Sequence, residues 1–133
     1  MAEHNDDIDD VRERRRAELR ESGQTPATPD EPVYIDGAAE LQELVSEHNA
    51  VLVDFHADWC GPCQMLEPTL ESLAADENTV VAKVDVDANQ ELAAEHGVQG
   101  VPNVILFADG EPTERVVGVR DERFYAELVA RAA

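Results

Sequence analysis

Apolar and polar positions alternate in blocks from residue 33 to the end of the chain, and the blocks predict a series of strands. Two runs, Ala50–Phe55 and Thr79–Val86, are almost wholly apolar, which is typical of strands buried on both faces of a sheet. Val33–Ile35 predicts a short edge strand. Val104–Ala108 and Arg115–Val119 predict a hairpin with its turn between them.

Helices are predicted between these strands, because apolar residues recur there at helical spacing. The predicted helices are Ala38–His48, a helix that begins at Cys60, Asn89–His96 and Asp121–Ala132. We expect Asp36 to cap the first, Pro68 to kink the second and Gly97 to end the third. Their expected inner faces are Leu41, Leu44 and Val45 in the first, Met65, Leu66, Leu70 and Leu73 in the second, and Phe124, Leu128 and Val129 in the last.

The resulting order is β-α-β-α-β-α-β-β-α. Strands that alternate with helices favour an α/β fold in which parallel strands lie between two layers of helices. The final hairpin adds an antiparallel pair. We therefore predict a central mixed β-sheet with helices on both faces, formed by residues 33–133.

Residues 1–32 have a different composition and are predicted to be an extension to this domain. Residues 8–21 are nearly all charged, with five arginines and only Ile8, Val11 and Leu19 as sizeable apolar side chains. Residues 22–32 contain one glycine and three prolines, as linkers do. We expect an acidic, arginine-rich, flexible extension; an arm that docks on a partner is the alternative.

The charge of the chain excludes some functions. The 133 residues include 30 acidic and 10 basic ones, a net charge of −20, so nucleic acid is not an expected partner. Lys83 is the only lysine. Strong self-repulsion is tolerable where salt screens it, which is typical of proteins from salt-loving organisms.

No apolar run is long enough for a membrane span, and the acidic start is unlike a secretory signal, so we expect a cytoplasmic protein.

The candidate chemistry lies at the start of the second helix, in the run Trp59-Cys60-Gly61-Pro62-Cys63. Two thiols three residues apart at a helix start face each other closely enough to form a disulfide. Gly61 permits a tight turn, and Pro62 fits a first helical turn. The free N–H groups of that turn favour a thiolate at the first sulfur. Cys60 is therefore the candidate nucleophile and Cys63 its resolving partner.

Two other interpretations of the cysteines stay open at this point. A zinc site needs four ligands, and His48, His56 or His96 would have to supply those missing from the cysteine pair. The usual spacing of such a site is absent. A structural disulfide is the other option, but so small a loop restricts the unfolded chain little. No metal or other cofactor is expected.

The chain resembles the thioredoxin family over roughly residues 33–133. The resemblance rests on residues 51–63 with Pro68 after them, on residues 81–85, and on Gly100-Val101-Pro102, Leu106-Phe107, Asp109-Gly110 and Gly118. It implies a thioredoxin-like fold and a thiol–disulfide oxidoreductase that reduces protein disulfides. It also implies a thioredoxin reductase as electron donor. We expect a monomer.

Asp54 is the candidate acid–base group. A carboxylate inside an apolar strand has little water around it, which raises its pKa and suits proton transfer with Cys63. The resemblance assigns that role to this position and implies that Lys83, on the neighbouring strand, tunes it. The plain alternatives are a buried structural Asp54 and an ordinary strand Lys83 with a solvated tip.

The resemblance also predicts a docking surface for substrate. It implies a cis peptide bond at Val101–Pro102, beside which an extended substrate segment would pair with the backbone of Val101. We expect Trp59, Gly100 and Gly118 to complete that surface, next to the turn of Gly61 and Pro62. A trans turn and a core tryptophan are the alternatives.

Three positions depart from the family pattern, namely His56, Gln64 and Asn103, where many members carry an aromatic residue, a lysine and a threonine. They bear on redox potential and reductase preference.

Two further functions stay possible. One is a disulfide oxidase or isomerase, and the other is a non-catalytic module that binds a partner through its N-terminal extension.

Overall fold

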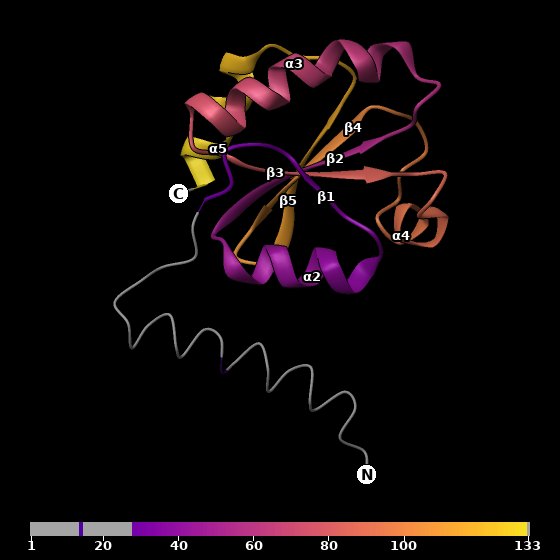
Figure 1. Cartoon of the computed structure of the whole chain (residues 1–133), viewed down its shortest axis with the longest axis horizontal. Helices are drawn as coiled ribbons and strands as arrows, with labels where there is room; N and C mark the ends of the chain where they lie inside the picture. Colours follow the sequence, from indigo (N-terminus) through magenta and orange to yellow (C-terminus); the bar gives the residue numbers. More distant parts are fainter. Residues whose placement is uncertain (1–13, 15–27, 133) are drawn as a thin grey trace.

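Five strands form one mixed sheet in the computed structural model, which describes residue 14 and residues 28–132 (Figure 1). The strand order is β1-β3-β2-β4-β5. β1 and β2 run parallel to β3, whereas β4 pairs antiparallel with β2 and β5 antiparallel with β4. The predicted mixed sheet is confirmed. The strands are β1 Val33–Tyr34, β2 Ala50–His56, β3 Val80–Asp85, β4 Asn103–Ala108 and β5 Glu111–Val117.

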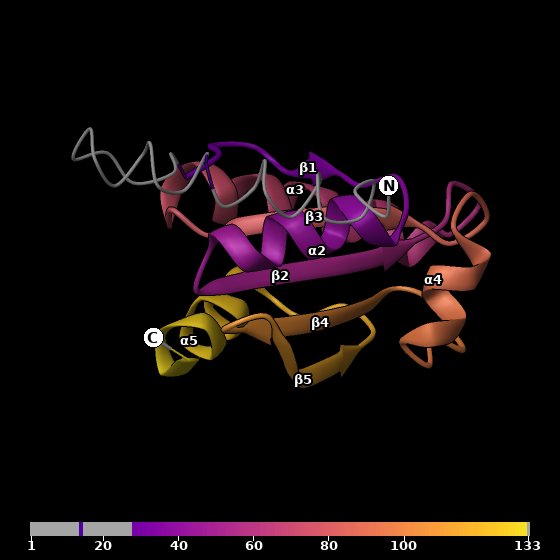
Figure 2. The same cartoon turned by 90° about the horizontal axis from the view of Figure 1, so that it is seen from below.

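Helices cover both faces of this sheet (Figure 2). On one face α2 and α4 pack on Val51, Val53 and Phe55 of β2. On the other face α3 and α5 pack on Leu52. Apolar side chains on both sides of β2 explain its continuous apolar run. The helices are α2 Ala38–Glu47, α3 Gly61–Asp76, α4 Gln90–Glu95 and α5 Glu122–Ala132.

The register of β2 decides where its polar residues lie. Side chains alternate along a strand, so Asp54 and His56 share the face of Leu52, beneath α3 and α5. Asp54 is paired with Lys83 of β3 and with Val104 of β4. The strand ends at His56, and a short loop returns the chain to the start of α3. The sheet therefore brings the buried carboxylate and the two cysteines to the same side of the molecule.

The hairpin begins earlier than the sequence predicted. β5 starts at Glu111 instead of Arg115, because only Asp109 and Gly110 form the turn, with φ of 53° and 83°. Positive φ at both turn residues is the geometry that joins two strands most tightly. Pro112 lies within β5, where the register shifts between Leu106 and Phe107. An edge strand with a bulge accommodates a proline, which has no N–H to donate.

Two predictions about helix ends and faces are wrong, and a third is incomplete. Gly37, not Asp36, caps α2, and it makes no side-chain capping bond. Met65 is 70% exposed instead of facing the core. In α5 the fully buried residue is Tyr125, whereas Phe124 and Val129 are only partly buried beside Leu128. The inner faces of α2 and α5 are otherwise centred where helical spacing placed them.

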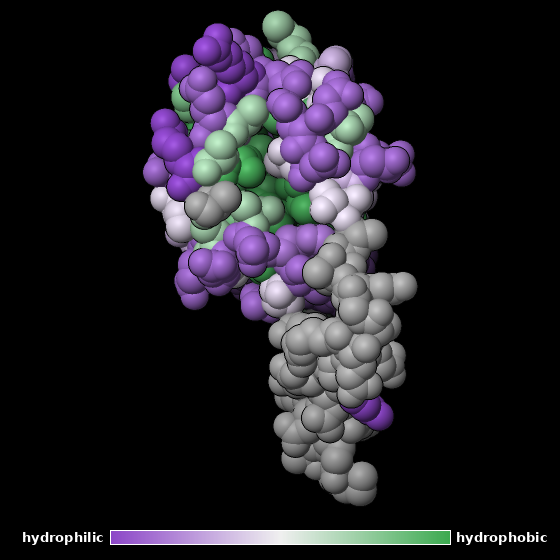
Figure 3. Space-filling model, turned by 90° about the vertical axis from the view of Figure 1, so that its left-hand side faces the viewer, coloured by the Kyte–Doolittle hydropathy of each residue, from purple (hydrophilic) through white to green (hydrophobic). Residues whose placement is uncertain are grey.

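The prediction for residues 1–32 falls mostly outside the described residues. Within the described part, no helix is long and apolar enough to cross a membrane. Asp54 is the only acidic residue buried in that part. Figure 3 shows one face on which hydrophilic residues surround a small hydrophobic hollow. The acidic charge of the domain is therefore carried almost entirely at its surface.

Candidate active site

Cys60 and Cys63 lie at the N-terminal end of α3 and are joined by a disulfide. Cys60 is the capping residue, and Gly61 and Pro62 form the start of the helix. The Cα atoms of Cys60 and Cys63 are 5.2 Å apart, within the ordinary range for a disulfide. The predicted close approach of the two sulfurs is confirmed.

The two sulfurs differ in their hydrogen-bond donors. The N–H of Cys63 donates to Sγ of Cys60 over 3.2 Å. No acidic residue lies in the first turn of α3, so the positive end of the helix dipole at Cys60 is not offset there. Both effects favour negative charge on Cys60 when the disulfide is reduced.

An attacking thiol is expected to be exposed, but Cys60 is not exposed in this oxidised form. Cys60 is 4% exposed and Cys63 is 3% exposed. Ala57 packs with the disulfide, and Val86 and Val101 cover it in part. Accessibility therefore does not separate the two sulfurs, and the donors around Cys60 must do so.

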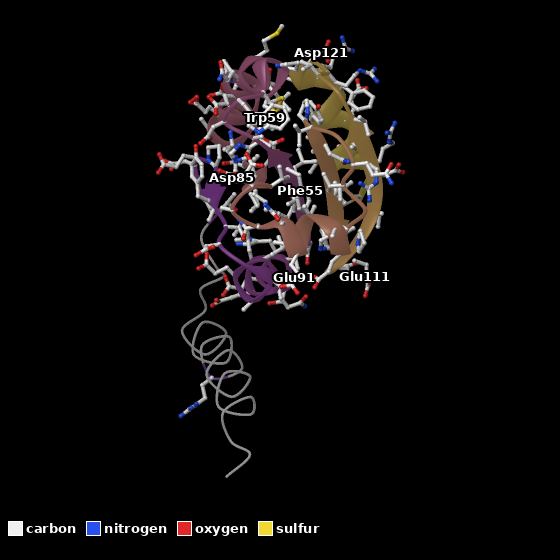
Figure 4. All side chains as sticks on the ribbon, turned by 90° about the vertical axis from the view of Figure 1, so that its right-hand side faces the viewer. Phe55, Trp59, Asp85, Glu91, Glu111 and Asp121 are labelled. Carbon is white, nitrogen blue, oxygen red and sulfur yellow. A yellow bond between two sulfur atoms is a disulfide. The ribbon has the colours of Figure 1, made fainter. Side chains whose placement is uncertain are left out.

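Trp59 lies beside the disulfide and is 71% exposed, so it is not a core residue (Figure 4). Its indole Nε1–H donates to Oδ2 of Asp87 over 2.9 Å. This bond fixes the ring at the surface, next to the sulfurs. Asp87 follows β3, and neither periodicity nor motif pointed to it.

The peptide bond between Val101 and Pro102 is cis, as the resemblance implied. The carbonyl oxygen of Val101 lies 3.7 Å from Sγ of Cys60. Gly118, whose φ of 93° suits a residue without a Cβ, donates its N–H to the carbonyl of Pro102 over 3.0 Å. Val101, Pro102 and Gly118 thus come together beside the dithiol.

Asp54 is fully buried on the α3 side of the sheet. Neither of its carboxylate oxygens has a hydrogen-bond partner among the described residues. Burial raises the pKa of Asp54 from an ordinary value of 3.8 to about 7, against the opposing charge of Lys83; the negative charge of Glu67 adds to the rise. A carboxyl group in this state can gain or lose a proton near neutral pH.

Lys83 is 3% exposed, so the alternative of an ordinary strand lysine with a solvated tip is wrong. Its Nζ lies 3.8 Å from Oδ2 of Asp54 and 3.2 Å from Oε1 of Glu67 in α3. The ring of Tyr34 lies 5.8 Å from the same ammonium. Sequence reasoning missed Glu67, although its spacing of four residues from Cys63 puts both on one side of α3.

The three residues that depart from the family pattern lie in different environments. His56 is 6% exposed, and burial, helped by the charge of Lys83, lowers its pKa. Gln64 donates from Nε2 to the carbonyl of Asp58 over 3.0 Å. Asn103 accepts a bond from Nη1 of Arg115 over 3.2 Å. Gln64 and Asn103 thus help to hold segments of the site in place through hydrogen bonds, whereas Nε2 of His56 is buried without a hydrogen-bond partner among the described residues.

The zinc interpretation finds no support in the described part of the chain, where no group of three or more potential ligands is placed to hold a metal ion. His48 lies at the end of α2. His96 packs against the rings of Phe55 and Phe107 on the other face of the sheet. His48 and His96 are thus separated from the cysteines.

Known proteins agree with this geometry. A sequence profile of the thioredoxin family matches residues 33–130. A mutant thioredoxin from Halobacterium salinarum NRC-1 is 54% identical, with a TM-score of 0.77; the match covers 80% of this chain and 94% of that one. A thioredoxin from Chlamydia muridarum is 48% identical over 100 residues, which are 68% of this chain and 98% of the relative.

A further relative is larger. The bifunctional thioredoxin reductase/thioredoxin of Mycobacterium leprae is 42% identical over 90 residues, which make up 66% of this chain and 20% of that protein. The family profile spans most of the chain and includes the disulfide, the cis-proline and the buried carboxylate. The chain therefore belongs to the thioredoxin family, with the Cys60–Cys63 pair as the redox centre of a thiol–disulfide oxidoreductase that reduces protein disulfides.

Proposed function

We propose that this oxidoreductase works through a two-step exchange. The Cys60 thiolate attacks one sulfur of a substrate disulfide, which forms a mixed disulfide and releases the other substrate sulfur as a thiolate. Cys63 then loses its proton to Asp54 and attacks the Cys60 sulfur. The second substrate thiolate leaves, and the Cys60–Cys63 disulfide forms. The observation that carries the proposal is the disulfide at the donor-rich start of α3, on the side of the sheet where Asp54 is buried.

The exposed surface around the disulfide is the proposed docking site for an extended substrate segment. Trp59 is exposed next to the sulfurs, and Val119, just after Gly118, is 40% exposed. The N–H of Val101 would pair with the backbone of the substrate, a contact that tolerates many sequences. Gly61 and Pro62 would form the other wall.

The alternatives make different demands. An oxidase or isomerase would require an oxidising compartment and partners that keep Cys60–Cys63 oxidised. A non-catalytic binding module would not require the buried Asp54, which is costly to fold around in its charged form. We favour reduction and propose a reducing, cytoplasmic setting, a monomer, and a thioredoxin reductase that returns the pair to the dithiol. A relative that combines reductase and thioredoxin in one protein supports the choice of donor.

Insulin reduction in molar KCl tests this function. The full chain with dithiothreitol should reduce insulin faster than dithiothreitol alone, and Cys60→Ser should not. Residues 31–133 alone should stay within about twofold of the full chain, since we propose that residues 1–32 are an extension and linker to the domain of residues 33–133. No acceleration by the folded full chain would favour the binding module. Failure of the shortened chain to fold would show that residues 1–30 are needed by the domain.

We also propose that the protein comes from a salt-loving organism and is stabilised by salt. Residues 31–133 contain 21 acidic and five basic residues, so the domain alone carries −16. At low ionic strength these charges repel one another over about 30 Å, and molar salt shortens that distance to about 3 Å. The 54% identity with a Halobacterium salinarum thioredoxin supports this origin.

The thermal midpoint is therefore expected to rise by 10 °C or more, on the order of 2 kcal/mol for a domain of this size, between about 0.01 M and molar KCl. Differential scanning calorimetry at constant pH measures it. Sucrose of equal osmolality is the control, since it stabilises by exclusion without screening charge. A midpoint that is flat in KCl, or that rises equally in sucrose, would contradict the charge argument.

A further inference from the structure

Lys83 has two carboxylates within reach, and the nearer one is not the buried aspartate. Its Nζ lies 3.2 Å from Oε1 of Glu67 and 3.8 Å from Oδ2 of Asp54. Only the contact with Glu67 meets the geometry of a hydrogen bond. Glu67 is 47% exposed, whereas Asp54 is fully buried. The ammonium, itself buried, is therefore bound by the carboxylate that lies nearer the surface.

A hollow of about 280 Å³ lies where this contact reaches the surface. Glu67 and Glu71 of α3 border it on one side, and Tyr34 of β1 borders it on another. Lys83 forms part of its lining, with the Tyr34 ring 5.8 Å from Nζ. The anion of Glu67 and the aromatic ring together hold the ammonium toward the hollow and away from the dry carboxylate.

The other groups around Asp54 supply no positive charge that could take the place of the Lys83 ammonium. Tyr125 faces it from α5 and is fully buried, and burial raises the pKa of its hydroxyl, with the charge of Asp54 adding to the rise. His56, two residues on in β2, is buried, and burial lowers its pKa, so it is neutral near pH 7. The neighbour in β4 is Val104. Lys83 is thus the cation that acts on Asp54.

We propose that Glu67 is a positioning residue that binds the Lys83 ammonium at the hollow and so withholds a close ion pair from Asp54. The proposal deepens the proposed function and rests on it, because the group that Glu67 controls is the proton acceptor of the resolving step. Without a close cation, the Asp54 carboxylate is a stronger base toward the Cys63 thiol. The proton moves from Sγ of Cys63 to a carboxylate oxygen of Asp54, and water takes it up after the exchange.

Removal of Glu67 should free Lys83 to pair with Asp54. In Glu67→Gln we expect the pKa of Asp54 to fall by about one unit, as for a carboxylate that gains a close cation. Glu71→Gln is the matched control, because Glu71 lies one turn later on α3 and lines the same hollow, but is not within 4 Å of Lys83 Nζ. There the pKa of Asp54 should move by less than about 0.3 units.

The measurement is a pH titration of the Asp54 carboxyl ¹³C resonance at one KCl concentration. Repeating both substitutions in a Lys83→Met chain tests whether Glu67 acts through the ammonium, since the difference between them should then shrink to the smaller direct effect of the Glu67 charge on Asp54. An unchanged titration in Glu67→Gln, an equal shift in Glu71→Gln, or a difference of undiminished size without Lys83 would each overturn the proposal.

A kinetic readout separates this proposal from the proposed function. In Glu67→Gln, the rate at which Cys63 resolves a preformed mixed disulfide should fall off on the acid side at a pH about one unit lower. The plateau above that pH should be about threefold slower than in the unmodified chain. If the carboxyl titrates as expected but the chain reduces no protein disulfide, the proposed function fails and the positioning role stands. If the chain reduces insulin normally and Glu67→Gln shifts neither titration nor pH profile, the positioning role alone fails.

Discussion

A Cys63→Ser chain is expected to stop as a covalent mixed disulfide with its substrate, and to lose at least about a thousandfold in turnover. The serine hydroxyl cannot attack a disulfide, so the intermediate on Cys60 has no exit. Cys60 keeps its advantages in this variant, since the donor to its sulfur is the backbone N–H of residue 63 and not the side chain. The first step should therefore proceed at near its normal rate.

The partner variant, Cys60→Ser, should trap almost no substrate. In it Cys63 lies one turn inside α3, is 3% exposed in the oxidised form, and lacks the N–H donor that Cys60 receives from residue 63. Both variants would be incubated with an oxidised protein, separated on a non-reducing gel, and the adduct identified by mass spectrometry. Alkylation of the reduced wild-type chain at mildly acidic pH should label Cys60 first.

The outcomes decide between the roles. Equal trapping by both variants, or trapping through Cys63 alone, would reverse the assignment of attacking and resolving thiols. Trapping by neither variant, with the fold intact by circular dichroism, would favour the binding module. Because Cys60 and Cys63 are almost equally buried in the disulfide form, preferential labelling of Cys60 would support hydrogen bonding, not exposure, as the source of its reactivity.

The strands buried in the middle of the sheet could be predicted from the sequence, because a short continuous apolar run is typical of a strand that is covered on both faces. β2 and β3 were placed within a residue or two at each end. β5 was not, since its first residues are polar, exposed and include Pro112, and nothing in that pattern alternates. Its first residues are a strand only because β4 offers a free edge to pair with, which is a tertiary fact.

The candidate site divides in the same way. The close approach of the cysteines and the raised pKa of Asp54 could be predicted, because a helix start and an apolar strand act on the residues within them. The burial of Cys60 could not, since it depends on Val101 and Val86 from separate segments. Nor could the contact between Lys83 and Glu67, which requires α3 to cross the sheet at one particular height. Tyr125 was missed because its neighbour Phe124 fits the same helical face nearly as well.

Asp54→Asn is expected to stabilise the protein at alkaline pH while it slows the enzyme. The pKa of Asp54 is raised in the folded state, so folding is favoured by the neutral carboxyl. The contribution of Asp54 to the stability of the protein is fully present below the unfolded pKa of about 3.8 and is lost as the pH rises toward the folded pKa of about 7. The charged group then costs up to about 4 kcal/mol. An asparagine amide, buried with few partners, still costs part of that, so we expect a net gain of about 1 to 3 kcal/mol at pH 8.

Urea unfolding of both proteins at several pH values in molar KCl measures this gain. It should shrink as pH falls from about 7 toward about 4, because the carboxyl of the unfolded chain then becomes protonated, as that of the folded chain already is. A gain of equal size at pH 4.5 and pH 8 would mean that something other than the charge of Asp54 is responsible. Glu71→Gln, which neutralises an exposed carboxylate on α3, is the control for a general loss of negative charge.

The same variant should slow the release of mixed disulfide about tenfold to a hundredfold near pH 7, because Cys63 would lose its proton acceptor. The attack by Cys60 on substrate should change little, since that thiolate is favoured by the start of α3 and not by Asp54. Rapid mixing with a fluorescent protein disulfide separates the two steps. Above about pH 9 the thiol of Cys63 ionises without help, so the two proteins should converge there. Equal release rates from pH 6 to 9 would show that Asp54 takes no part in the resolving step and that its burial only lowers the stability of the protein.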